Sequence, residues 1–126
     1  MSNSSMKAVY FSYPSGFLFS VDTMNENSGR FSGQFQKRNN NVELVSGGFN
    51  FYNSQNRTDL VFSSNTDDWS LTAPYSNGAP FFESWSVRRT SKSNAADFTD
   101  MEFNMDLSGQ GGSWFGSTDW WGTGKF

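Results

Sequence analysis

Apolar residues along this chain alternate with polar ones, with a period of two, in several separate segments. In a β-strand that period places the apolar side chains on one face. The alternating apolar sets are Phe17, Phe19 and Val21; Phe31 and Phe35 around Gly33; Phe49 and Phe51; and Met101, Phe103, Met105 and Leu107. No segment shows a comparable helical stripe, so the pattern predicts an all-β protein.

Turn-forming residues separate these runs at intervals of about eight to fifteen residues, which is typical of hairpin-connected antiparallel strands. The spacing predicts strands near residues 7–13, 16–23, 30–36, 42–52, 58–64, 68–73, 81–90, 98–107 and 113–125. No linker divides the chain. We therefore expect residues 1–126 to form a single antiparallel small β-barrel of about eight or nine strands, with a β-sandwich as the alternative.

The alternation also predicts which residues face one another in three hairpins. A turn centred near Glu26 would set Phe19 opposite Gly33, so that a ring covers a glycine on the neighbouring strand. A turn through residues 37–41 would set Gly47 beside Phe31. Glycines inside strands permit tight curvature, which favours a closed barrel over a flat sandwich.

The third hairpin carries charges on its polar face. A turn centred near Asn94 would set Arg88 opposite Asp100 and Trp85 over Phe103. Cross-strand charge pairs of this kind mostly stabilise a sheet. We expect the pair to be structural.

Composition makes the predicted core aromatic. The 126 residues include 14 Phe, 5 Trp and 4 Tyr, and only 35% of the chain is hydrophobic. Aromatic side chains bury a large area each, so few apolar positions can still fill one interior. The net charge of −3 and the lack of a Lys/Arg cluster give no electrostatic footprint for nucleic acid or anionic lipid.

Cysteine and histidine are both absent from the sequence. Disulfides, thiol chemistry and the common zinc sites are therefore excluded, as is the usual general base. We expect no cofactor and no metal. Any catalytic chemistry would have to come from carboxylates, Tyr, Lys, Arg or Ser.

The first residues are polar and no apolar run of signal-peptide length follows them. No stretch approaches the roughly 20 apolar residues of a transmembrane segment. We expect a soluble protein that is cytoplasmic or secreted without a visible signal peptide, unless such a peptide was trimmed.

The Gly- and Trp-rich C-terminal segment is the first candidate site. It contains Trp114, Asp119, Trp120 and Trp121. Two adjacent tryptophans on one strand point to opposite faces, so one can be exposed. An exposed indole beside polar side chains suits a sugar, because the apolar face of a pyranose stacks on the ring. The alternative is that these rings pack internally or at the interface of a homo-oligomer.

A second candidate site combines Trp69 with Tyr75 and Asn77 in a region rich in turn residues. These side chains could contact a sugar or another ligand. The neighbouring Asp67 and Asp68 lack the ligand spacing of an EF-hand loop, and two adjacent carboxylates are usually a solvated turn.

Glu83 is the one catalytic candidate. Strict alternation would place it on the apolar face with Trp85 and Val87. A carboxyl group inside a barrel has a raised pKa, as a general acid requires. The alternative is an irregularity at Ser84 that turns Phe82 inward and leaves Glu83 at the surface.

Small barrels such as the avidins, the lipocalins and the dirigent and allene oxide cyclase barrels are similar to this chain in general pattern. That similarity is architectural and implies no ligand. The many aromatic, Asn and Ser residues favour a non-enzymatic, lectin-like carbohydrate-binding protein. The alternatives are a barrel that holds an apolar small molecule in its lumen, as a binder or a cyclase or isomerase using Glu83, and a membrane-active or self-assembling β-protein.

Overall fold

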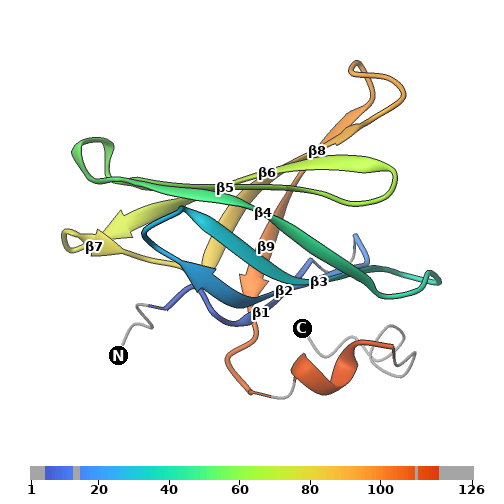
Figure 1. The fold of residues 1–126 in the computed structure, drawn as a ribbon, viewed down its shortest axis with the longest axis horizontal. Helices are drawn as coiled ribbons and strands as arrows, with labels where there is room; N and C mark the ends of the chain where they lie inside the picture. The colour runs from blue at the N-terminus through green and yellow to red at the C-terminus, as the bar shows by residue number, and fades with distance from the viewer. Residues whose placement is uncertain (1–4, 13–14, 110, 117–126) are drawn as a thin grey trace.

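The computed structural model describes residues 5–12, 15–109 and 111–116, and this part of the chain is all-β (Figure 1). The strands are β1 (Val9–Ser12), β2 (Phe17–Asn25), β3 (Arg30–Lys37), β4 (Glu43–Tyr52), β5 (Arg57–Ser63), β6 (Asp67–Ser76), β7 (Ala79–Pro80), β8 (Ser84–Ser91) and β9 (Phe98–Met105). Two short 3-10 turns, η1 (Asn53–Gln55) and η2 (Gly111–Trp114), are the only helical pieces in these ranges.

Eight of the strands form a closed antiparallel barrel. Each pairs with the next along the chain, β6 pairs with β8, and β1 pairs with β9 to close the ring. The short strand β7 pairs only with β6 and lies outside the ring. The predicted barrel is therefore confirmed, and the sandwich alternative is not observed.

Aromatic side chains fill the barrel, as the alternation predicts. Phe19 stacks on Phe62 with ring centroids 4.5 Å apart and nearly parallel planes. Phe62 stacks in turn on Trp69 at 5.9 Å. Towards the other end, Phe82 stacks on Trp85 at 5.8 Å. Such contacts add to the free energy that these side chains contribute through burial alone.

Two of the three predicted hairpin registers are confirmed. Gly47 lies beside Phe31 in the β3/β4 pair. In the β8/β9 pair Arg88 opposes Asp100, and the Arg88 Nε to Asp100 Oδ1 distance is 2.7 Å. Both hairpins run through these positions without a register shift, so simple counting works.

The third register, in the β2/β3 hairpin, is wrong by two residues. Phe19 faces Phe35, and Val21 rather than Phe19 faces Gly33. The ladder shifts between Val21 and Thr23, and the turn spans residues 26–29 with Gly29 at a φ of 68°. The pairing of Asn25 with Arg30 puts the turn centre between residues 27 and 28 rather than at Glu26, which displaces the register by three residues. The extra residue of the β-bulge on β2 reduces this displacement to two at Phe19.

The predicted last strand, residues 113–125, is also wrong where the structure describes it. Residues 111–114 form the 3-10 turn η2, which lies outside the barrel next to β1 (Figure 1). There Trp114 packs with Leu18 on the outer wall, and Phe11 meets the indole edge-on at 6.2 Å. Residues 117–126 lie outside the described part of the chain.

The described residues include no helix of the length and apolarity needed to cross a membrane.

Candidate functional site

One end of the barrel carries a layer of polar side chains above the aromatic core. This end is formed by the loops that join β1 to β2, β3 to β4, β5 to β6 and β8 to β9. In β3, β4, β5, β6, β8 and β9 the inward-facing phase reaches a polar residue here, two positions beyond the last apolar one. We call this end the polar mouth. Its inward-facing polar side chains are Lys37, Glu43, Ser64, Asp67, Arg89 and Thr99, and it includes Lys92 and Asp97 of the β8/β9 loop.

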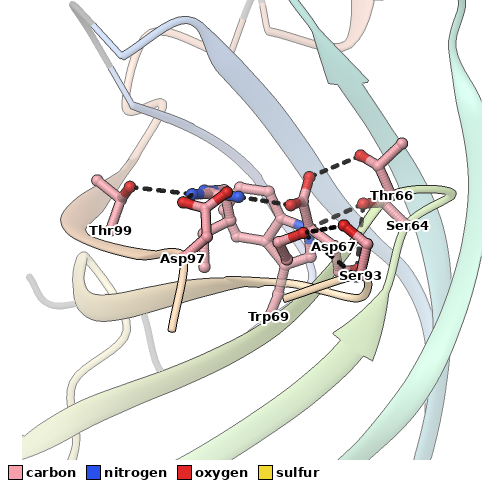
Figure 2. Close-up of polar contacts among 9 residues, drawn as sticks. Ser64, Thr66, Asp67, Trp69, Ser93, Asp97 and Thr99 are labelled. Carbon is pink, nitrogen blue, oxygen red and sulfur yellow. Dashed lines mark hydrogen bonds and ion pairs between the residues drawn. The ribbon is translucent and has the colours of Figure 1, made fainter. Parts of the chain in front are cut away.

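A fixed ion network lies at the centre of the polar mouth (Figure 2). Arg89 Nη1 donates to Asp67 Oδ1 at 2.6 Å, and Arg89 Nη2 donates to Asp97 Oδ1 at 2.8 Å. The Thr66 hydroxyl donates to the second oxygen of Asp67 at 2.7 Å. The Asp67 and Arg89 side chains are only 10% and 16% exposed, so water screens their pairing weakly.

These contacts hold the guanidinium as a cation. Its hydrogen bond to Asp67, together with the attraction of both carboxylates, raises the pKa of Arg89. Thr99 accepts a further hydrogen bond from Arg89 Nη2 at 3.2 Å. The network therefore ties β6, β8 and β9 together at this end.

Trp69 supports the network from below. Its indole Nε1 donates to Ser64 Oγ at 3.0 Å, and the Ser64 backbone N–H donates to the Asp67 carbonyl at 2.9 Å. Phe17 meets Trp69 edge-on with ring centroids 4.9 Å apart. The β5/β6 turn is thus anchored to an aromatic floor, and Asp67 is held at its edge.

Two hollows open above this floor. The larger has a volume of about 740 Å³ and the smaller about 300 Å³, at the scale of sites that hold small molecules. Both are bordered by Lys37, Asn65, Thr66 and Asp67. The larger hollow is further lined by Phe17, Arg89, Ser91, Lys92, Ser93 and Asp97, and the smaller by Phe35, Asn40, Asn41, Val42, Glu43 and Ser64.

The residues predicted as ligand contacts do not come together. Trp69 is 1% exposed and belongs to the core below the mouth. Tyr75 is half-buried at the opposite end of the barrel, where its hydroxyl donates to Asn53, and Asn77 has a φ of 55° in the turn between β6 and β7. Trp114 is buried against the outer wall of the barrel.

Asp119, Trp120 and Trp121 lie outside the described residues, so their predicted role stays a prediction.

Glu83 precedes β8, and the structure agrees with the second of the two alternatives in turning Phe82 inward. Phe82, not Glu83, joins Trp85 in the aromatic core, because the alternation is interrupted before Ser84. Glu83 is half-buried, and its backbone carbonyl accepts a hydrogen bond from the Met105 N–H at 2.9 Å.

Sequence reasoning missed three cations of the mouth. Lys37 and Arg89 lie in the inward phase of β3 and β8, and Lys92 follows β8 directly. The sequence did contain a signal for Lys37 and Arg89, because each stands two residues beyond an inward apolar residue, Phe35 or Val87 respectively. A charged residue that keeps the inward phase at a strand end is a candidate for the rim of a barrel.

Among the described residues no cluster of three or more carboxylates could hold a metal ion.

Fold and site together define a class: an eight-stranded up-and-down β-barrel with an aromatic interior and a polar, ion-paired mouth. Comparison of the chain with family models, with curated proteins and with solved structures finds no match.

Proposed function

We propose that this chain is a non-enzymatic, lectin-like protein that binds a saccharide at the polar mouth. The observation that carries the proposal is the lining of the two hollows, where amide and hydroxyl side chains surround the fixed Asp67–Arg89–Asp97 network. Sugar hydroxyls both donate and accept hydrogen bonds, so they match a wall that offers both kinds of group.

The arrangement of the carboxylates favours binding over catalysis. Asp67 and Asp97 each commit an oxygen to Arg89. A glycosidase needs one carboxyl group as an acid and a second as a base or nucleophile on either side of the scissile bond. Two carboxylates engaged by one guanidinium suit the role of fixed hydrogen-bond acceptors instead.

Packing of the lumen makes the apolar-ligand alternative less well supported. An apolar molecule would have to displace core rings that stack with centroids 4.5 to 5.9 Å apart. A ligand at the mouth displaces only solvent. The membrane-active alternative rests on the C-terminal tryptophans, which the described residues do not include beyond Trp114.

The test is a glycan array followed by calorimetric titration of the best ligand, with the wild type, Asn65→Ala and Trp121→Ala. The Asn65 side chain borders both hollows and is exposed, so its truncation removes a contact without disturbing the core. We expect affinity to fall about tenfold in Asn65→Ala and to stay unchanged in Trp121→Ala, since one lost hydrogen bond to a ligand is worth about that much.

Two outcomes would reject the proposal. Absence of binding to every glycan at millimolar concentration would remove the lectin function. Loss of binding in Trp121→Ala with full affinity in Asn65→Ala would move the site from the mouth to the C-terminal segment.

A further inference from the structure

The charges around the larger hollow are not equally engaged. Three cationic side chains, Lys37, Arg89 and Lys92, and two anionic ones, Asp67 and Asp97, line it. The local balance is therefore positive, although the whole chain has a net charge of −3.

Each carboxylate of the mouth already has a partner. Asp67 and Asp97 are bound to Arg89, and Glu43 Oε1 accepts a hydrogen bond from the Asn65 backbone N–H at 2.8 Å. The two terminal nitrogens of Arg89, in turn, donate hydrogen bonds to Asp67, Asp97 and Thr99.

The two lysines differ from the other charges of the mouth. Within the described residues neither the Lys37 nor the Lys92 ammonium forms an ion pair. Lys37 occupies the inward phase at the end of β3, and the Lys92 backbone is fixed by its hydrogen bond to the Thr66 carbonyl at 3.0 Å. Each ammonium has three donors to offer a ligand.

We propose that the polar mouth takes an acidic saccharide and that Lys37 and Lys92 hold its anionic substituent in the larger hollow. This inference rests on the proposed saccharide function and names its ligand class. In the smaller hollow Lys37 is accompanied by the carboxylates of Glu43 and Asp67. Its lining therefore suits the uncharged hydroxyl groups of the saccharide.

Lysine is a compact point charge and does not impose the planar, two-pronged geometry of arginine. Carboxylate and sulfate groups both satisfy it. The shared chemistry is an anionic group on a sugar ring, and the ligand panel decides which of the two is preferred.

The experiment titrates three matched oligosaccharides: a neutral galactose oligomer, the corresponding galacturonate oligomer and a sulfated galactose oligomer. The proteins are the wild type, Lys37→Gln, Lys92→Gln, the double variant and Lys7→Gln. Lys7 is exposed on the segment before β1, so it controls for the loss of one positive charge anywhere on the molecule.

We expect the wild type and Lys7→Gln to bind at least one acidic oligosaccharide about tenfold more tightly than the neutral one, with the preference reduced at high salt. The double variant should lose this preference and bind the acidic and the neutral oligosaccharides with equal affinity. Preference for galacturonate assigns a carboxylate ligand, and preference for the sulfated oligomer assigns a sulfate ligand.

Equal binding of neutral and acidic ligands by the wild type would overturn this inference and leave the saccharide function standing. The same holds if the double variant keeps the acidic preference. Absence of binding to all three oligomers and to the wider array would remove both proposals.

Discussion

Gly33 and Gly47 stand where neighbouring strands leave no room for a side chain. A Cβ atom on Gly33 would lie 1.8 Å from the Ser20 carbonyl oxygen, and one on Gly47 would lie 1.9 Å from that of Val61. Because the obstacles are backbone atoms, no rotamer change could relieve them. The strands themselves would have to move.

Gly33→Ala should therefore lower the free energy of unfolding by about 2–3 kcal/mol, as overpacking in a rigid interior does. Gly112→Ala is the control, because a Cβ there meets nothing within 4 Å, and it should change stability by less than about 0.5 kcal/mol. Urea unfolding measures both. Equal stability of the two variants would show that the barrel wall yields easily at Gly33.

Tyr10 is a fully buried phenol among the aromatic rings. Its hydroxyl donates to the Met6 carbonyl at 2.8 Å, and burial raises the pKa of Tyr10, since the phenolate would lose its hydration. Below pH 10 the group is protonated in both the folded and the unfolded chain. Above pH 10 the unfolded chain loses this proton and the folded chain keeps it.

Unfolding free energy should consequently fall by about 1.4 kcal/mol per pH unit above pH 10 on account of Tyr10. Tyr10→Phe should lose about 1 kcal/mol near pH 8, through the missing hydrogen bond, and then show a shallower alkaline decline. Tyr52→Phe, at a half-buried position on the barrel surface, should keep the wild-type decline. Denaturant titrations from pH 8 to 11 measure the unfolding free energy of the three proteins. If it declined equally with pH in all three, the alkaline decline would not come from Tyr10.

Among the elements, η2 has a role that the alternation did not predict. It covers an apolar strip on the outside of the barrel, where Leu18 is fully buried although it faces away from the core. Gly116 N–H adds a hydrogen bond to the buried Gln36 Oε1 at 3.0 Å. The segment after β9 thus acts as an external brace on β1, β2 and β3.

Trp114→Ala should destabilise the protein by about 2 kcal/mol or more, because it exposes the apolar surface of Leu18 and Phe11. Leu107→Ala is a matched truncation in the same C-terminal region at a residue that is 71% exposed, and it should have little effect. Thermal unfolding of both variants provides the measurement. A wild-type melting temperature for Trp114→Ala would mean that η2 contributes no stability.

Two of the three hairpins have the register that the sequence predicts. Gly47 and Arg88 find their predicted partners because their ladders run without a shift. In the β2/β3 hairpin the turn lies beyond Glu26 and the ladder also shifts after Val21, and nothing in the apolar alternation of these strands marks either feature. A bulge is selected by the curvature of the closed sheet, so a single hairpin does not reveal it.

For the whole molecule, the seam between β1 and β9 has the fewest paired residues of any strand pair in the described ring. Only two residue pairs join these strands, whereas seven join β5 to β6 and seven join β8 to β9. The seam joins the first strand of the ring to the last, so its paired residues are farther apart in sequence than those of any other strand pair in the described ring.

Native-state hydrogen exchange should show the seam opening before the rest of the barrel. The Asp106 amide, which donates to the Val9 carbonyl at 2.8 Å, should exchange with an opening free energy about 2 kcal/mol or more below that of the β5 and β6 amides. Low concentrations of denaturant should leave its exchange rate unchanged. Exchange of all these amides through global unfolding would show that the ring opens only as a unit.

By itself, the sequence determined the all-β class and the aromatic identity of the core, and it favoured a barrel over a sandwich. Alternation at a period of two is a local property, since each strand carries its own inward phase. Tertiary structure alone decided that Lys37, Asp67 and Arg89, from three separate strands, meet in one polar mouth. It also decided that Trp69 supports this mouth from within the core rather than presenting a ring to a ligand. The physical reason is that barrel closure sets which strand ends become neighbours, and closure depends on shear, bulges and the β1/β9 seam together.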